Sequence, residues 1–510
     1  MSVITVSNLT FAYPSSYDNI FENVSFSINT DWKLGFIGRN GRGKTTFLNL
    51  LMGKYEYSGK ITAQVNFDYF PFEVRDKSMN SLEIAAEINP DFEENYEQWK
   101  LEREVSLLEM NPDEILTRPF ETLSKGEQTK VLLAILFIKE NNFLLIDEPT
   151  NHLDAESRAA VAKYLKNKNS FILVSHDRAF LDTCVDHVLS INRANIEIQK
   201  GNFSSWWENK ERQDNFELAE NEKLKRDIGR LEKSARQSAG FSNQTEAGKS
   251  RDISQSDNRV DKGFVGKKAA KMMKRSIHAQ NRREKAVEDK SKLLKNIETA
   301  ESLKLDPLDF RTDRLIEISD LSIFYGENQI FEDVSFTVEN GERVQLKGKN
   351  GSGKSSIIKL ILGQEIKYSG EVYVPNDLII SYVSQDTSFL HGNLADFAKA
   401  NNIDESLFKS ILRKLDFARI QFEKNIENYS EGQKKKVLIA KSLCEQADLY
   451  IWDEPLNYID VLSRIQIEEL ILNYCPTMIF VEHDELFSEK VATKSLVLES
   501  NYRSKQKRGK

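Results

Sequence analysis

The chain has 510 residues, of which 40% are hydrophobic and 29% are charged. This balance is that of an ordinary globular protein, and at about 150 residues per domain the length predicts roughly three domains. The longest apolar run, Val131 to Ile138, is much shorter than the about 20 residues that span a membrane. The N-terminus lacks the pattern of a secretory signal. We therefore expect a cytoplasmic protein and exclude integral membrane and secreted proteins.

The three cysteines are consistent with a reducing compartment. Cys184, Cys444 and Cys475 lie far apart without CxxC spacing, so neither a zinc site nor a disulfide framework is expected.

The formal net charge of −8 is unevenly distributed along the chain. Between Lys223 and Lys295 there are 21 Lys and Arg residues against 9 Asp and Glu. A basic segment within an acidic protein indicates a localised contact with a polyanion.

Four motifs occur twice in the same order, about 306 to 310 residues apart. GRNGRGKTT at 38–46 returns as GKNGSGKSS at 348–356, and LSKGEQ at 123–128 as YSEGQK at 429–434. LLIDEPTNHLD at 144–154 returns as YIWDEPLNYID at 450–460, and VSHD at 174–177 as VEHD at 481–484. The chain therefore contains a duplicated domain.

The repeats predict two α/β domains, at residues 1–205 and 313–500, each with a largely parallel, buried sheet. Each GxxxxGK[ST] motif follows an apolar segment and precedes a helix-like run, which is the order of a P-loop. Residues 206–312 have helical apolar spacing, broken near 240–266, and predict a hairpin of two long helices with a loop tip there. A solvated coiled-coil spacer is the alternative. Residues 501–510 form a basic tail, which is either an RNA contact or disordered.

The two P-loops predict an ATP site with Mg²⁺ in each domain. Glycines let backbone N–H groups surround phosphates at a helix N-terminus, the lysine neutralises charge and the hydroxyl holds the metal. The residues assigned to these loops are Gly38, Asn40, Gly41, Gly43, Lys44, Thr45 and Thr46 in the first copy and Gly348, Asn350, Gly351, Gly353, Lys354, Ser355 and Ser356 in the second.

Acidic residues and a histidine follow each P-loop at matching distances. Asp147 and Asp453 are expected to complete the Mg²⁺ shell with Thr45 and Ser355. The next residues, Glu148 and Glu454, are placed to polarise an attacking water. His176 and His483 are placed to steady the γ-phosphate end.

These motifs resemble ATP-binding-cassette domains, and a pair of them without a membrane domain resembles the ABC-F family of ribosome-associated ATPases. Within that family, WKLGFIGRNGRGKTT, SHDRAFLD, WDEPLNYID and MMKRSIH resemble the Lsa-type antibiotic-resistance proteins. These protect the ribosome against lincosamides, streptogramin A and pleuromutilins.

The resemblance implies a head-to-tail sandwich in which each ATP lies between one P-loop and the signature turn of the other domain. We call these composite sites the Lys44 site and the Lys354 site. The further ATP contacts it implies are Ser124, Gly126, Ser430 and Gly432 of the signature turns and the adenine-stacking Tyr13 and Tyr325, for which packing is the alternative role. Gln385 matches the family's glutamine that senses Mg²⁺ and water.

The two copies depart from each other in ways that predict unequal sites. Phe72 occupies the position of Gln385 in the first copy, and Tyr429 replaces the leucine of the signature. Leu456 and Tyr458 replace Thr and His in the EPTNHLD motif. Phe72 and Tyr429 belong to the Lys44 site, so we expect this site to hydrolyse ATP more slowly.

The basic linker predicts contact with ribosomal RNA, because lysine and arginine neutralise phosphates and exposed aromatics stack on unpaired bases. Phe241 and Phe264 have core packing as their alternative role. The candidate contacts are Phe241, Val260, Phe264, Lys267, Lys268, Lys271, Lys274 and Arg275.

The sequence thus predicts a monomeric ATPase that binds the bacterial 70S ribosome, contacts its RNA and tRNA, and confers drug resistance by ribosomal protection. A translation factor without drug specificity is the alternative within this class. The alternatives outside it are an exporter ATPase subunit, which leaves the basic linker unexplained, and a DNA-acting protein, for which the linker is too short.

Overall fold

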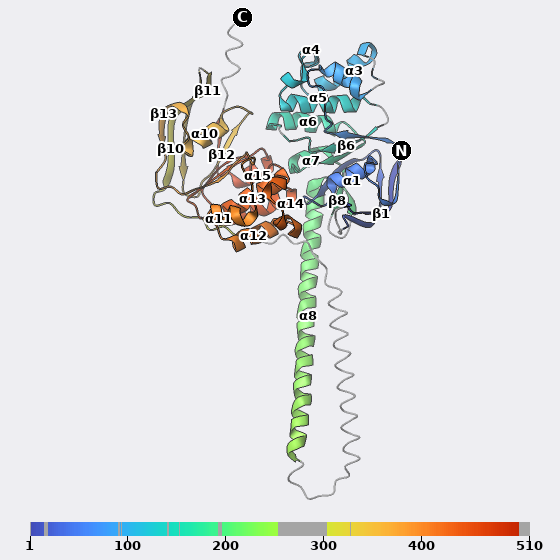
Figure 1. The fold of residues 1–510 in the computed structure, drawn as a ribbon, viewed down its shortest axis with the longest axis vertical. Coiled ribbons are helices and arrows are strands. Elements are labelled where there is room, and N and C mark those ends of the chain that lie inside the picture. Colours follow the sequence, from blue (N-terminus) through green and yellow to red (C-terminus); the bar gives the residue numbers. More distant parts are fainter. Residues whose placement is uncertain are drawn as a thin grey trace. The chain divides into compact units, whose positions relative to one another are not determined.

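The computed structural model describes residues 2–14, 19–89, 92, 94–139, 142–151, 153–191, 196–252, 303–326 and 328–498. Both predicted α/β domains are present (Figure 1). They belong to one compact unit, Met1–Trp206 with Ala300–Lys510, and Trp207–Thr299 is a second unit.

The first domain is built on a six-stranded sheet in the order β5-β6-β7-β3-β8-β9. All neighbouring strands are parallel except β8 and β9. A separate antiparallel sheet has the order β2-β1-β4. The strands are β1 Val3–Phe11, β2 Phe21–Asn29, β3 Lys33–Gly38, β4 Ser58–Thr62, β5 Asn66–Phe70, β6 Asn142–Asp147, β7 Phe171–Val174, β8 His187–Ile191 and β9 Ile196–Lys200.

The second domain repeats this plan with a five-stranded parallel sheet, β14-β15-β16-β12-β17, and an antiparallel sheet, β11-β10-β13. Its strands are β10 Arg314–Tyr325, β11 Asn328–Glu339, β12 Arg343–Gly348, β13 Lys367–Tyr373, β14 Ile380–Val383, β15 Leu449–Asp453, β16 Met478–Val481 and β17 Lys494–Leu498. The largely parallel sheet predicted for each domain is confirmed.

Helices connect the parallel strands, as crossovers between such strands require. The helices of the first domain are α1 Lys44–Leu51, α2 Ser81–Ile88, α3 Glu94–Leu107, α4 Pro112–Ile115, α5 Lys125–Ile138, α6 Ala155–Lys166 and α7 Arg178–Cys184. Those of the second are α10 Lys354–Ile361, α11 Leu394–Ala400, α12 Glu405–Lys414, α13 Glu431–Cys444, α14 Val461–Tyr474 and α15 Glu485–Val491.

The central strands are buried on both faces because apolar side chains alternate toward two sets of packed elements. In the second domain, Tyr450 and Trp452 of β15 join one core and Leu449 and Ile451 join the other. For this reason the sequences of these central strands, such as YIWD in β15, are nearly continuous apolar runs.

The second domain begins earlier in the chain than the sequence pattern indicates. Leu303 and Leu305 are buried in the core that contains β15, and Phe310 is buried in the core of the antiparallel sheet. Residues 303–312, predicted as linker, therefore pack with the second domain.

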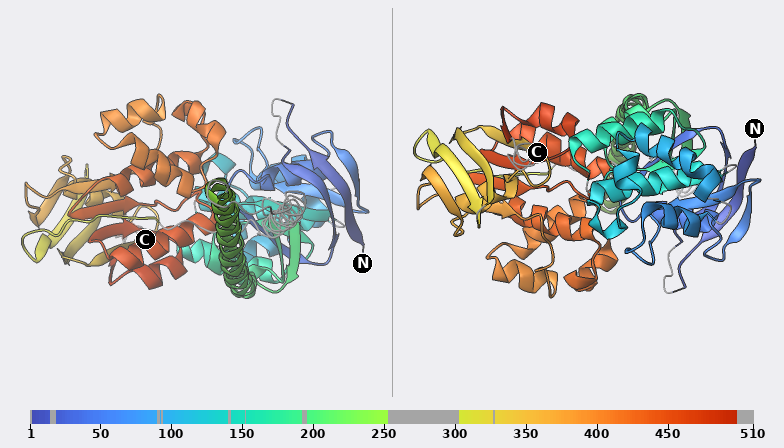
Figure 2. Two further views of the ribbon diagram at one scale, coloured as in Figure 1. Left: turned by 90° about the horizontal axis from the view of Figure 1, so that it is seen from below. Right: turned by 90° about the horizontal axis from the view of Figure 1, so that it is seen from above.

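The first linker helix, α8, runs from Phe203 to Asp252. Figure 2, seen from below, shows it nearly along its own axis as one continuous helix. It passes through Gly240, so the prediction that a loop begins there is wrong. One glycine costs a helix only about 1 kcal/mol, which the neighbouring helix-forming residues offset. Phe241 therefore lies in a helix, and the rest of the expected tip, from Val260 to Arg275, lies outside the described residues.

Buried ion pairs join the two α/β domains. Arg178 at the start of α7 donates from Nη2 to Glu468 Oε2 on α14 at 2.6 Å, and both side chains are almost fully buried. Within the second domain, Glu468 also pairs with the exposed ammonium of Lys490 at 2.6 Å. Arg42 donates to Asp416 at 3.2 Å. Charges buried in this way depend on their partners, because an unpaired buried charge is costly.

We predict that Arg178→Met lowers the free energy of unfolding by about 3 kcal/mol, because Glu468 then loses its buried partner. Thermal and urea unfolding of the full chain measure this loss. Arg178→Met/Glu468→Met is the matched control and should recover part of the stability. A single variant as stable as the native chain would contradict the prediction.

Candidate functional site

The two P-loops have the same local geometry. α1 and α10 begin at Lys44 and Lys354, directly after glycines whose φ angles are 91° and 96°. An added Cβ at Gly353 would lie 2.7 Å from Phe331, so backbone conformation and packing both require glycine. Neither helix has a side-chain cap, which leaves the first-turn N–H groups as donors for phosphate.

Each P-loop lysine is buried and donates to carbonyls of its own loop. Lys44 Nζ donates to Gly38 O at 2.7 Å, and Lys354 Nζ donates to Gly348 O at 2.8 Å. Burial lowers the pKa of both lysines, and nearby carboxylates oppose that effect. Each ammonium is thus held next to the N-terminus of the P-loop helix.

Hydroxyls adjacent to the lysines contact other predicted site residues. Thr45 Oγ1 donates to Asp147 Oδ2 at 2.9 Å. The Tyr13 hydroxyl lies 2.9 Å from Thr46 Oγ1, and that of Tyr325 lies 3.1 Å from Ser356 Oγ. Both predicted tyrosines therefore lie beside their P-loops.

The residues present in the second domain suit a divalent cation. Asp453 Oδ1 is buried and has no hydrogen-bond partner among the described residues, and burial raises the pKa of this carboxyl. Ser355 and Gln385 line the same cavity as the P-loop of this domain. Oxygen donors from a hydroxyl, an amide and a carboxylate are the set that Mg²⁺ prefers.

The acidic and histidine candidates meet at the carboxyl ends of the parallel strands. Glu148 Oε1 lies 3.4 Å from His176 Nε2, and Glu454 Oε1 lies 3.4 Å from His483 Nε2. Both glutamates have left-handed backbone, with φ of 51° and 48°. Such strained conformations persist where the surroundings hold them, often at functional sites.

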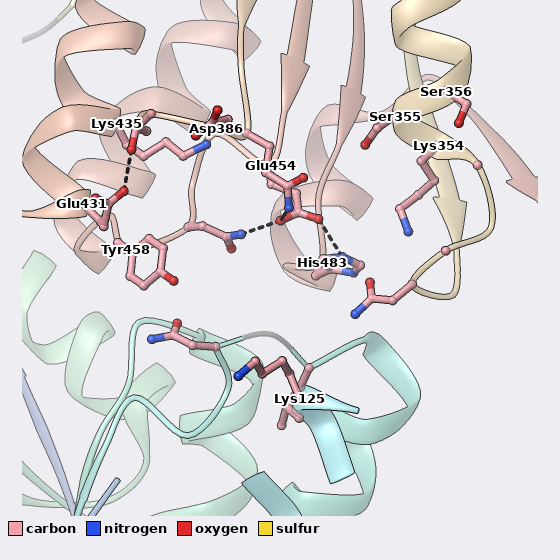
Figure 3. A pocket seen from close by; sticks show the side chains of 18 of the residues that line it. Lys125, Lys354, Ser355, Ser356, Asp386, Glu431, Lys435, Glu454, Tyr458 and His483 are labelled. Atoms are coloured by element: carbon pink, nitrogen blue, oxygen red, sulfur yellow. Dashed lines mark hydrogen bonds and ion pairs between the residues drawn. The ribbon is translucent and has the colours of Figure 1, made fainter. Parts of the chain in front are cut away.

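The Lys354 P-loop faces a cavity of about 680 Å³ (Figure 3). Its walls include Lys125 and Asn151 from the first domain and Tyr325 from the second. Because Lys125 lies between Ser124 and Gly126, the first signature turn lies next to the second P-loop.

The Lys44 P-loop also contacts the opposite domain. Asn40 Nδ2 donates to the Tyr458 carbonyl at 2.8 Å. A Cβ added to Gly432 would lie 2.4 Å from that carbonyl and 3.1 Å from Asn40 Nδ2. The second signature turn therefore lies against the first P-loop.

Both signature serines cap the helices that follow them. Ser124 Oγ accepts from Glu127 N at 3.3 Å, and Ser430 Oγ accepts from Gln433 N at 3.4 Å. A hydroxyl that accepts a hydrogen bond keeps its own proton to donate. The capping role is therefore compatible with contact to a phosphate.

The prediction that Phe72 and Gln385 occupy equivalent positions in the two copies agrees with the strand registers. Tyr69 pairs with Leu145, two residues before Asp147, and Tyr382 pairs with Ile451, two residues before Asp453. Counting three residues onward from each tyrosine gives Phe72 and Gln385.

The two glutamates consequently have different surroundings. Glu454 Oε2 accepts from Gln385 Nε2 at 2.8 Å and from Asn457 Nδ2 at 2.7 Å. Burial by itself would raise the pKa of Glu454, but the hydrogen bond and charge of His483, with Gln385, bring it below its usual value. For Glu148, burial and the charge of Asp147 raise the pKa to about 8.

Sequence reasoning missed the contact of Tyr69 with the site and gave no contacts for Tyr429. The Tyr69 hydroxyl donates to Asp147 Oδ2 at 3.0 Å, beside Thr45. Tyr429 turns its hydroxyl toward the Gln421 carbonyl, at 2.7 Å, and packs edge-on against Phe417. Its contacts are thus those of a core residue in the second domain. The available signal was that Tyr69 and Tyr382 occupy equivalent positions, on strands that pair with those ending at Asp147 and Asp453.

The protein-family model described as "ABC transporter" matches residues 21–151 and 331–457. The chain belongs to this family. It carries the family's ATPase domain twice, binds ATP and hydrolyses it to ADP and phosphate. Among the described residues of this ABC protein, no helix is both long and apolar enough to cross a membrane.

Relatives of this ABC protein match it along nearly its whole length. Ribosome protection protein VmlR of Bacillus subtilis is 28% identical over 512 residues, covering 99% of this chain and 88% of the relative. The energy-dependent translational throttle protein EttA of Haemophilus influenzae is 26% identical over 529 residues, covering 93% and 88%. The predicted resemblance to ABC-F proteins is confirmed.

Solved structures show the same fold. The archaeal ribosome recycling factor aABCE1, in complex with the stalk protein aP1, matches with a TM-score of 0.60 and 18% identity, covering 96% of this chain and 87% of its own. The structure titled RNase-L Inhibitor matches with a TM-score of 0.57 and 18% identity, covering 93% and 85%.

We predict that Glu454→Gln lowers ATP turnover about tenfold or more, whereas Glu148→Gln has a smaller effect. The reason is that Gln385, Asn457 and His483 surround Glu454, and removal of an oriented general base costs a large factor. Steady-state phosphate release from the two purified variants measures it. Equal losses, or a larger loss from Glu148→Gln, would reject unequal sites.

Proposed function

We propose that this chain is a ribosome-associated ABC-F ATPase that confers antibiotic resistance by ribosomal protection. The observation that carries the proposal is the similarity to VmlR over 99% of the chain. The basic composition between Lys223 and Lys295 supports it, because such a segment binds folded RNA through phosphate neutralisation.

In this proposal ATP lies at each composite site, between one P-loop and the signature turn of the other domain. Lys44 and Lys354 neutralise phosphate charge, while backbone N–H groups at the starts of α1 and α10 donate to phosphate oxygens. Mg²⁺ would be held by Thr45 and Asp147 at one site, and by Ser355, Asp453 and Gln385 at the other. When bound, the ion neutralises charge that develops on the phosphate oxygens.

Hydrolysis is assigned to the glutamate and histidine of each site. Glu454 orients and polarises the attacking water, and Gln385 and His483 fix its carboxylate. Glu148 and His176 form the corresponding pair at the Lys44 site. Positioning of this kind, with stabilisation of developing charge, is the main source of rate in phosphoryl transfer.

Nucleotide is proposed to control ribosome binding by favouring one arrangement of the two ATPase domains. Asn40 of the first P-loop contacts the second domain, and Lys125 of the first domain lines the cavity at the second P-loop, so ATP bound at these places bridges both halves. A ligand shifts a conformational equilibrium only by its differential affinity for the two states. Hydrolysis removes the bridging γ-phosphate and permits release from the ribosome.

We predict that Glu148→Gln/Glu454→Gln with ATP co-sediments with 70S ribosomes at low salt. ATP then bridges the domains without being hydrolysed, and the basic linker contacts ribosomal RNA. Binding should weaken steeply as salt rises, because counterions compete for the phosphates. Lys44→Ala/Lys354→Ala is the matched control and should stay in the supernatant, as should the first variant if the proposal is wrong.

A translation factor without drug specificity is the second candidate, since EttA matches 93% of the chain. Drug susceptibility of cells separates the two. We predict that expressing the native chain raises the inhibitory concentration of lincosamides, streptogramin A or pleuromutilins, and that Lys44→Ala/Lys354→Ala, which cannot bind ATP, does not. Unchanged susceptibility to all three, with ribosome binding intact, would favour the translation factor.

A further inference from the structure

Two buried charges at the Lys354 site, one of which, Lys435, lines its cavity, have no counterpart in the first domain. Lys435, on α13, is 2% exposed, and Glu482, at the end of β16, is 7% exposed. The corresponding positions of the first domain hold Thr129 and Ser175. Burying a lysine and a glutamate is costly unless each is paired and hydrogen-bonded, so their presence in one domain alone calls for a role.

Glu482 joins the loop after Glu454 to the histidine of the same site. Its Oε1 accepts from Leu456 N at 2.8 Å, and its Oε2 accepts from His483 N at 3.1 Å. In the first domain two hydroxyls, Thr150 Oγ1 and Ser175 Oγ, lie 3.4 Å apart at this place. In the second domain Leu456, at the position of Thr150, has no hydroxyl. The Glu482 carboxylate, at the position of Ser175, instead accepts from the backbone N–H of Leu456.

Lys435 fixes the segment that carries Gln385. Its Nζ donates to the Ser384 carbonyl at 2.9 Å, one residue before Gln385. Burial lowers the pKa of Lys435, and the charges of Glu482, Asp453 and Glu454 oppose that effect. The positive charge of the Lys435 ammonium is therefore opposed by the negative charge of these carboxylates, and the ammonium is hydrogen-bonded to the loop that carries Gln385.

Each of the two buried residues contacts the backbone beside a different partner of Glu454, while the third partner, Asn457, lies on the loop after Glu454 itself. Gln385 Nε2 donates to Glu454 Oε2 at 2.8 Å. His483 Nε2 lies 3.4 Å from Glu454 Oε1 (Figure 3). Lys435 restrains the backbone before Gln385, and Glu482 restrains the backbone of His483. We propose that Lys435 and Glu482 are positioning residues for ATP hydrolysis at the Lys354 site, acting through Gln385 and His483.

The test uses the full chain, in the native form and in a Glu148→Gln background that limits turnover to the Lys354 site. Lys435→Thr and Glu482→Ser should each lower kcat roughly 10- to 100-fold, the usual effect of removing a residue that orients a site. KM and the amount of ATP bound should remain within about twofold, because a positioning residue acts on the hydrolysis step and not on the binding of ATP. Thr129→Ala in the first domain is the matched control and should leave kcat unchanged.

A transplant distinguishes positioning from general destabilisation. Lys435→Thr/Leu456→Thr/Glu482→Ser installs the residues of the first domain and leaves neither buried charge unpaired, so its kcat should exceed that of either single variant. Three results would overturn the proposal: single variants with native kcat, losses of kcat that track losses of folded protein or bound ATP, or a triple variant no more active than the singles. The turnover of Glu148→Gln alone, compared with that of the native chain, measures the inequality of the two sites independently of Lys435 and Glu482.

Discussion

The site depends first on the hydrogen bonds that hold each P-loop lysine inside its own loop. A buried ammonium needs acceptors, and Lys44 and Lys354 find them in the carbonyls of Gly38 and Gly348. The loop can fold back far enough to supply these carbonyls because glycine at 43 and 353 adopts left-handed backbone. The same turn starts a helix without a side-chain cap, so the ammonium and the first-turn N–H groups converge on one place.

The two sites share this frame but differ in the groups around the glutamate. At the Lys354 site an amide from Gln385 and another from Asn457 occupy one oxygen of Glu454, and buried charges lie behind them. At the Lys44 site the strand residue Tyr69 shares Asp147 Oδ2 with Thr45. Duplication preserved the backbone plan, while the side chains that orient the carboxylates diverged.

Contacts between the domains make each site composite. Asn40 reaches the Tyr458 carbonyl, and the close approach at Gly432 leaves no room for a Cβ. The buried pair of Arg178 and Glu468 connects the segment that follows His176 to α14 of the second domain. A bound nucleotide would therefore act on residues of both domains, which is what a switch driven by ATP requires.

The sequence by itself determined the duplicated α/β domains and the P-loops, because these features follow from local motifs at constant spacing. It also located Phe72 at the position in the first copy that is equivalent to Gln385 in the second. It placed the linker loop too early, since a single glycine at 240 is a weak signal against a long helix. The packing of residues 303–312, the hydrogen bond from Tyr69 to Asp147 and the roles of Lys435 and Glu482 were decided only by tertiary structure. Each joins segments distant along the chain, where no local pattern shows which polar groups meet.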